Sequence, residues 1–175
     1  MNKNVKSNPI SRKTIRIDSD DPRCDYEDEI SCIAKELDKG KLIIYPTETV
    51  YGLGVDFLNE TGMNRLYSVK RREISKQISV IAADMKMAVD YIEIPNSAAK
   101  MLMETFWPGP LTIVFPARNA YFSNRFDKNS TIGIRVPGSS FCRNLAGKFG
   151  RPITATSANL AGERECISVE QIHKD

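Results

Sequence analysis

Short apolar runs that resemble β-strands alternate along this chain with segments of helical periodicity, and this alternation most constrains its fold. The apolar runs are four to six residues long and rich in β-branched residues, which favours strands over helices. Strands that alternate with helices are typical of an α/β or α+β domain, in which helices flank a twisted sheet. The sequence predicts strands at residues 42–45, 78–83, 111–115, 131–136 and 153–157.

The helical segments carry their own start and stop signals. Apolar residues between positions 30 and 37 recur at helical spacing, and Gly40 is a suitable stop. Asp84 and Asn96 are typical N-cap residues. The sequence predicts helices from residue 25 to Gly40, around residues 63–70, after Asp84, after Asn96, over residues 140–149 and from Ser168, which has capping-box spacing to Gln171.

Length and charge exclude several classes of protein. The chain has 175 residues, enough for one domain with a core, and no apolar run approaches the roughly 20 residues that span a bilayer. Residues 1–24 form a polar N-terminal extension without a signal-peptide pattern, and we expect the first 20 residues to be dispensable for the fold. A cytoplasmic protein is predicted. Because the net charge is only +3, any attraction for phosphate must be local.

Cysteine and histidine usage argues against a metal site. The four cysteines, Cys24, Cys32, Cys142 and Cys166, have no CxxC spacing, and we expect them to be reduced and structural. The single histidine, His173, lies three residues from the end of the sequence, which argues against a catalytic triad or a histidine-ligated metal. The sequence therefore predicts no protein-held metal.

Two loops carry candidate ligand-binding groups in the first half of the chain. The segment YPTETVYGLG presents Thr47, Glu48, Thr49 and Tyr51 at the tip of a predicted strand, although a polar loop with two turn glycines explains it equally well. The segment SVKRREISKQ contains Lys70 and Arg72, which are two residues apart and would share one face of an extended segment, with Arg71 on the other. They could close on one phosphate chain. The alternative is a solvated helix end, where cations complement the helix dipole.

Two further segments supply an arginine and neutral polar groups. Arg135 ends the predicted strand in TIGIRVPG, where its guanidinium could hold a carboxylate, although a surface arginine is equally compatible. Ser157 and Asn159 follow the last predicted strand and are suited to phosphate oxygens or a nucleotide. The alternative for them is a turn that closes the strand. No P-loop or GxGxxG pattern is present in the sequence.

Taken together, these segments resemble the YrdC-like threonylcarbamoyl-AMP synthase family. The resemblance runs from about residue 40 to residue 162, and five separated motifs agree with the family in order and approximate spacing. The motifs are YPTETVYGLG, the Lys70-x-Arg72 pair, FWPGPLTIVFPA, TIGIRVPG and TATSANLAG. The resemblance implies a single YrdC/RibB-like domain over residues 25–175, with a mixed sheet and a concave cleft. It also implies that the domain lacks its C-terminal end, because the family's domain continues further.

The resemblance also implies roles for individual residues. Lys70, Arg72, Ser157 and Asn159 match the family's catalytic tetrad and would contact the phosphates of ATP, with Thr131 near the nucleotide. The implied threonine-binding residues are Thr47, Tyr51, Arg135 and Ala155, with Arg135 on the substrate carboxylate.

The implied reaction joins L-threonine, bicarbonate and ATP into threonylcarbamoyl-AMP and diphosphate, which makes the chain a nucleotidyltransferase. Mg²⁺ would arrive with the nucleotide. The product would pass to a transferase that forms N6-threonylcarbamoyladenosine at tRNA position 37. Two alternatives stay open: a module that binds RNA without chemistry, for which only weak affinity is expected, and a regulatory relative that has lost the activity.

Overall fold

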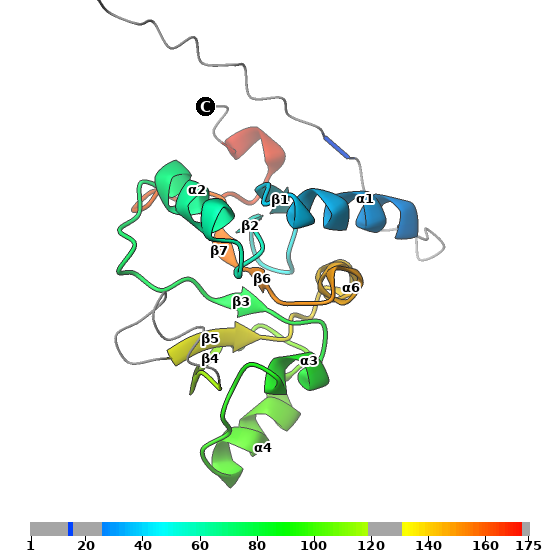
Figure 1. The fold of residues 1–175 in the computed structure, drawn as a ribbon, viewed down its shortest axis with the longest axis vertical. Helices are drawn as coiled ribbons and strands as arrows, with labels where there is room; N and C mark the ends of the chain where they lie inside the picture. Colours follow the sequence, from blue (N-terminus) through cyan, green and yellow to red (C-terminus); the bar gives the residue numbers. More distant parts are fainter. Residues whose placement is uncertain (1–13, 16–25, 119–130, 173–175) are drawn as a thin grey trace, which may run out of the picture.

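The computed structural model describes residues 14–15, 26–118 and 131–172 of the chain (Figure 1). Thr14 and Ile15 lie in no helix or strand. The other residues of the N-terminal extension, which we expected to be dispensable for the fold, lie outside the described residues.

The centre of the molecule consists of two small sheets. The first has the order β1 (Ile43–Tyr45), β2 (Gly52–Gly54), β7 (Thr156–Ser157), and both pairings are antiparallel. The second has the order β4 (Ile113–Pro116), β5 (Thr131–Arg135), β3 (Val80–Ile81), β6 (Ile153–Thr154), and β3 and β5 run parallel. The expected mixed α/β architecture is therefore confirmed.

The predicted strand at 153–157 is divided between the two sheets. Ala155 separates β6 from β7, and its N–H donates to Ser79 O at 2.7 Å instead of continuing a ladder. The same segment therefore pairs with β3 through β6 and with β2 through β7. This places Ser157 at the junction of the two sheets.

Helices cover these sheets on several sides (Figure 1). The helix α1 (Glu27–Asp38) packs against α6 (Ser140–Phe149), whereas α3 (Met85–Val89) and α4 (Ser97–Phe106) lie at the opposite end of the view from α1 and α2 (Glu60–Lys70). The predicted caps Asp84 and Asn96 are confirmed, because their side chains accept the N–H groups of Met87 and Ala99. The 3₁₀ helix η1 (Val169–Gln171) begins with the predicted capping box.

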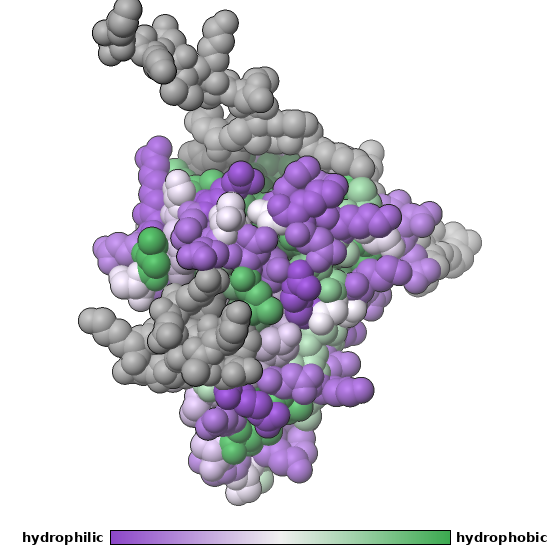
Figure 2. All heavy atoms as spheres, viewed as in Figure 1, coloured by the Kyte–Doolittle hydropathy of each residue, from purple (hydrophilic) through white to green (hydrophobic). Residues whose placement is uncertain are grey.

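Two groups of buried side chains form the core. One lies between α1, α6 and the sheets and includes Leu37, Leu145 and Ile153. The other includes Leu66 of α2 and Ile134 of β5. Hydrophilic side chains cover most of the upper part of the face shown in Figure 2, over α1 and α2. Both helices are thus amphipathic, with their apolar sides inward.

The first predicted strand is less buried than its apolar composition suggested. Ile44, in the middle of β1, is 47% exposed. The reason is that β1 is the edge strand of its sheet and only one of its faces packs against the core. Among the described residues, no helix is long and apolar enough to cross a bilayer.

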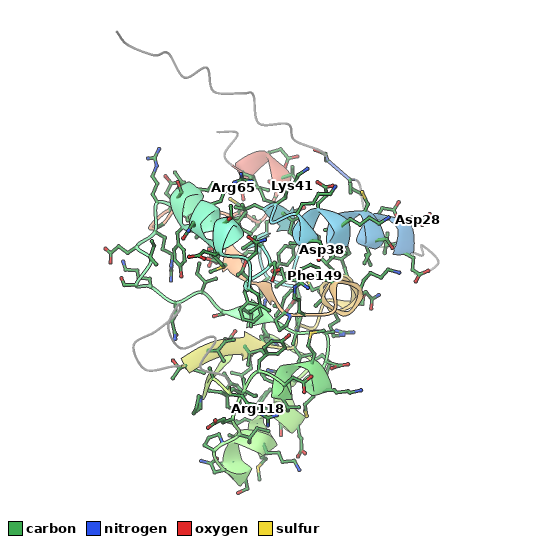
Figure 3. The ribbon with its side chains drawn as sticks, viewed as in Figure 1. Asp28, Asp38, Lys41, Arg65, Arg118 and Phe149 are labelled. Atoms are coloured by element: carbon green, nitrogen blue, oxygen red, sulfur yellow. The ribbon has the colours of Figure 1, made fainter. Side chains whose placement is uncertain are left out.

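Arg151 connects the two helices that pack together. Its guanidinium lies 2.9 Å from carboxylate oxygens of both Asp38, at the end of α1, and Asp56. It also lies 4.3 Å above the ring of Phe149, the last residue of α6 (Figure 3 labels Asp38 and Phe149). These contacts fix the ends of α1 and α6 relative to the strands.

Gly54 is a position where an added methyl group should be costly. A Cβ there would lie 2.7 Å from Tyr45 Cε1 and 2.9 Å from Ile153 Cγ2, and the Tyr45 ring is held because its hydroxyl donates to Thr154 O at 3.0 Å. We expect Gly54→Ala to lower the free energy of unfolding by about 1–3 kcal/mol, measured by urea denaturation. Gly147→Ala, in α6, is the control, because its Cβ would meet only Ala83 Cβ at 3.6 Å. Similar stability of both variants would contradict this prediction.

Candidate functional site

Two of the sequence motifs meet through Lys70, the last residue of α2. Its ammonium group donates hydrogen bonds to the backbone carbonyls of Ser157 and Asn159, the latter at 2.8 Å. The N–H of Ala161 returns a bond to Lys70 O at 3.0 Å. Lys70 is only 2% exposed, so this contact is a buried junction and not a surface encounter. The Lys70 side chain thereby contacts two residues that lie 87 and 89 positions later in the sequence.

The backbone after Lys70 does not continue as the extended segment that the sequence analysis expected. The helix ends at Lys70, and Arg71 adopts a left-handed conformation with φ of 50°. The N–H groups of Arg71 and Arg72 bond back to Ser68 O and Tyr67 O, which closes the helix. Arg71 is exposed and Arg72 is half-buried. The expected separation of these side chains is observed, but the cause is a helix cap, so the predicted strand-like alternation was wrong.

Two buried polar atoms at this junction have no hydrogen-bond partner among the described residues. Arg72 donates to Gln77 O at 2.8 Å through Nη2, yet its Nε is buried without an acceptor. Asn159 donates to Glu163 O at 2.7 Å through Nδ2, yet its Oδ1 is buried without a donor. Buried polar groups are normally satisfied, so an unused donor and acceptor indicate a site that a ligand or water completes.

The junction is also electrostatically unfavourable without a ligand. Burial and, as the second cause, the neighbouring positive charge of Arg72 together lower the pKa of Lys70 to about 8. Burial and like charge both oppose a cation, and a bound anion would relieve them. The two cations Lys70 and Arg72, with the unused Nε donor of Arg72, therefore suit a polyanion.

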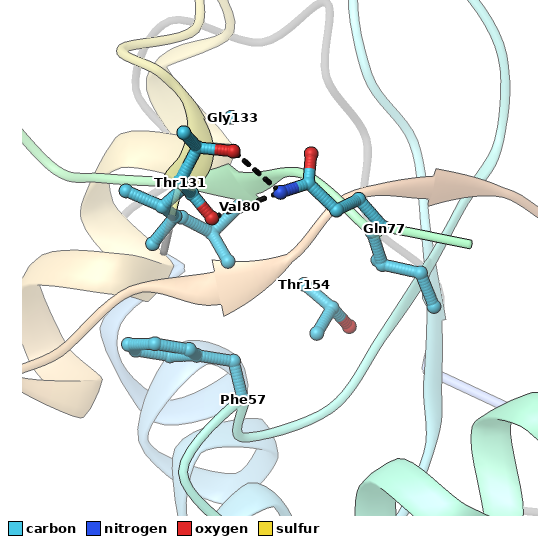
Figure 4. Close-up of a pocket in the computed structure, with 8 residues that line it drawn as sticks. Phe57, Gln77, Val80, Thr131, Gly133 and Thr154 are labelled. Atoms are coloured by element: carbon cyan, nitrogen blue, oxygen red, sulfur yellow. Dashed lines mark hydrogen bonds between the residues drawn. The ribbon is translucent and has the colours of Figure 1, made fainter. Parts of the chain in front are cut away.

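Gln77 links the junction to Thr131. Its backbone carbonyl accepts Arg72, and its side-chain amide donates to Thr131 Oγ1 at 2.8 Å and to Thr131 O at 2.9 Å. Gln77 and Thr131 line a small pocket with Phe57 and Thr154 (Figure 4). This pocket does not include the four residues of the predicted tetrad. The two cations and the two buried atoms without partners lie at the junction instead, which makes the junction the stronger candidate site.

Sequence reasoning did not identify Gln77 as a site residue. The available signal was its position directly before the strand that follows the basic run. A polar residue directly before a buried strand lies where its side chain can bond to a neighbouring strand.

A second charged group lies at the end of β5. Arg135 Nη1 lies 3.2 Å from Glu48 Oε1, and the two side chains are only 12% and 24% exposed. Among the described residues, no hydrogen bond or ion pair joins this pair to Lys70 or Arg72. Glu48 was expected at the tip of its strand but was assigned no role, and its position in the TET sequence between two candidate threonines gave no specific signal.

The other residues expected near Arg135 are placed by backbone contacts. The Thr47 hydroxyl donates to Val50 O at 2.6 Å and accepts the N–H groups of Thr49 and Val50, so it closes a local turn. The backbone of Tyr51 accepts the N–H of Ala158 at 2.8 Å, which sets Tyr51 beside the loop that contains Ser157. Ala155 is half-buried between β6 and β7.

The described residues contain no group of three or more histidine, cysteine or acidic side chains that could hold a metal ion. Cys142 and Cys166 are free thiols, and Cys24 lies outside the described residues. Burial raises the pKa of Cys142 to about 11, so its thiol is protonated at neutral pH.

Comparisons with known proteins give consistent relatives. The family model for Sua5, YciO and YrdC proteins, described as "Telomere recombination", matches residues 35–175. A threonylcarbamoyl-AMP synthase of Vibrio vulnificus is 37% identical over 142 residues, which cover 80% of this chain and 76% of the relative. Among solved structures, P. abyssi Sua5 complexed with L-threonine is 32% identical with a TM-score of 0.74. That match covers 82% of this chain and 42% of Sua5, so the chain spans less than half of that protein. E. coli YciO shares the fold, with a TM-score of 0.71 at 24% identity.

Proposed function

The chain belongs to the Sua5/YciO/YrdC family, and we propose that it is an enzyme that forms threonylcarbamoyl-AMP and diphosphate from L-threonine, bicarbonate and ATP. The product serves the N6-threonylcarbamoyladenosine modification of tRNA position 37, after transfer by partner enzymes. The observation that most supports this proposal is the buried junction between Lys70 and the backbone of Ser157 and Asn159, where a buried Arg72 donor is unused.

The junction suits phosphoryl chemistry that needs no protein nucleophile. The neutral amine of threonine attacks bicarbonate, and loss of water leaves a carbamate. A carbamate oxygen then attacks the α-phosphorus of ATP while the bond to the β-phosphate breaks and diphosphate leaves. This transition state spreads negative charge over phosphate oxygens, which fixed cations stabilise. An ammonium group has three donors, so Lys70 retains one N–H for a phosphate after its two carbonyl bonds. Arg72 Nε, Ser157 Oγ and the region of Thr131 complete the nucleotide side in this proposal.

Mg²⁺ is proposed to enter with the nucleotide. Phosphate oxygens and water are its usual ligands in nucleotide sites, and its charge would reduce the repulsion between ATP and an incoming carbamate. Asn159 Oδ1 is a suitable acceptor for a water bound to that ion, because it is buried and has no partner among the described residues.

The decisive experiment is incubation of the protein with ATP, L-threonine and bicarbonate, followed by mass spectrometry. We expect threonylcarbamoyl-AMP and an equal amount of diphosphate, and neither product when threonine or bicarbonate is omitted. Absence of product despite ATP binding would favour the regulatory alternative. Binding of RNA with a steep salt dependence and no product would favour the RNA-binding alternative.

Arg135→Ala tests the threonine side of the proposal. Arg135 is the proposed anchor of the threonine carboxylate, and a lost charged hydrogen bond costs about 1.5–3 kcal/mol. We expect the KM for threonine to rise by about 10- to 100-fold while the Kd for ATP changes by less than about threefold. Steady-state kinetics at saturating ATP and a separate ATP titration measure the two quantities. Equal losses for both substrates would contradict the assignment.

A further inference from the structure

The carboxylate site at Arg135 is already filled by a carboxylate of the protein itself. Glu48 Oε1 lies 3.2 Å from Arg135 Nη1; the Arg135 side chain is 12% exposed and the Glu48 side chain is 24% exposed. A substrate carboxylate that takes the guanidinium must therefore displace Glu48. The displaced carboxylate then loses its ion-pair partner, and a charge in a partly buried place is more stable when it is paired.

Glu48 cannot move far when it is displaced. Two hydrogen bonds hold the turn that carries Glu48. The Thr47 hydroxyl donates to Val50 O at 2.6 Å, and the Cys142 thiol donates to Pro46 O at 3.3 Å. Gly138 N–H also approaches Glu48 Oε1 at 3.4 Å. Displacement therefore requires rotation of the Glu48 side chain about a backbone that these contacts hold in place.

An amino acid supplies the partner that Glu48 needs. In an amino acid one carbon separates the ammonium group from the carboxylate that binds Arg135. The ligand therefore brings a positive charge close to Glu48 when Glu48 loses its contact with the Arg135 guanidinium. One ion pair within the protein is exchanged for two ion pairs with the zwitterion, and no charge is left unpaired. A hydroxy acid would take Arg135 equally well but would leave Glu48 unpaired.

We propose that Glu48 is a specificity-determining residue that receives the α-ammonium group of the amino-acid substrate after the substrate carboxylate displaces it from Arg135. This inference rests on the proposed threonine-dependent function. In this proposal Glu48 binds the ammonium group and Arg135 binds the carboxylate of one zwitterion, and the two side chains pair with each other in the free protein.

The test compares two ligands that differ only in the amine. L-threonine and (R)-3-hydroxybutanoate share the carboxylate and the hydroxyl, and their Kd values are measured by calorimetry without ATP on the full chain. Wild type should prefer threonine. Glu48→Gln should weaken threonine by about tenfold or more and should tighten 3-hydroxybutanoate, because no ion pair has to be broken. Glu48→Asp, which keeps the charge, should retain part of the preference.

The outcomes separate the possible explanations. Tighter binding of both ligands by Glu48→Gln would mean that Glu48 only blocks Arg135, and unchanged binding of both would mean that it has no role; either result overturns the inference. If wild type binds no threonine, the proposed function itself fails. Glu104→Gln is the charge-matched control, because Glu104 is an exposed residue of α4 with a surface partner at 3.7 Å, and it should leave both Kd values unchanged. Thermal unfolding of each variant checks that the fold is intact.

Discussion

Arg72→Ala is expected to lower the rate of threonylcarbamoyl-AMP formation by at least about 100-fold, the usual cost of removing a preorganised donor to a charged transition state. Arg72 supplies both a fixed positive charge and a buried Nε with no partner among the described residues. The same substitution should remove most of the rise in melting temperature that ATP produces, since a ligand stabilises only the state that binds it. Product formation is measured by mass spectrometry and the stabilisation by thermal unfolding with and without ATP.

Arg71→Ala is the matched control for this prediction. Arg71 carries the same charge one residue earlier, but its left-handed φ of 50° and its exposure place it on the outer side of the helix cap. We expect its activity to stay within about threefold of wild type, as for most exposed charges. If both substitutions behave alike, and added salt suppresses ATP binding in the same proportion, the segment is a diffuse basic surface and Arg72 has no special position.

Local chemistry explains which parts of the fold were predictable. The helix Ser140–Phe149 and the caps at Asp84 and Asn96 depend on neighbours within four residues, so the pattern of residues is enough to find them. The division of the last strand at Ala155 depends on Ser79, which is 76 positions earlier, and apolar character alone carries no information about such a partner.

The candidate site shows the same limit. Lys70, Arg72, Ser157 and Asn159 were brought together by resemblance to a family, since no periodicity relates them. The resemblance did not predict that Lys70 would bind the backbone of the opposite loop, or that Arg71 would adopt a left-handed cap. Glu48 was assigned no role because its importance comes from contact with Arg135 across the fold, and a glutamate between two threonines has no local signature.

Lys70 is expected to give the most informative pH dependence in this protein. In the free protein the pKa of Lys70 is lowered to about 8, first by burial and then by Arg72. Bound phosphates would favour the charged form. ATP affinity should therefore fall as the pH rises through about 8, because the free protein loses the proton that the complex requires. The total decrease should be about 10- to 100-fold, the value of a charge-assisted hydrogen bond.

Lys70→Met isolates this effect, since it keeps an unbranched side chain and removes the titrating group. The variant should bind ATP weakly at pH 7, lose at least about 100-fold in activity, and show no further loss of affinity up to pH 9.5. The pH dependence of the free energy of unfolding gives a second test of the same pKa shift. Between pH 8 and the unfolded pKa of 10.5 the unfolded chain binds more protons at this residue, so wild type should gain stability relative to Lys70→Met as the pH rises. A parallel pH dependence of wild type and variant, in both ATP affinity and urea stability, would show that Lys70 is not the titrating group and would remove it from the phosphate site.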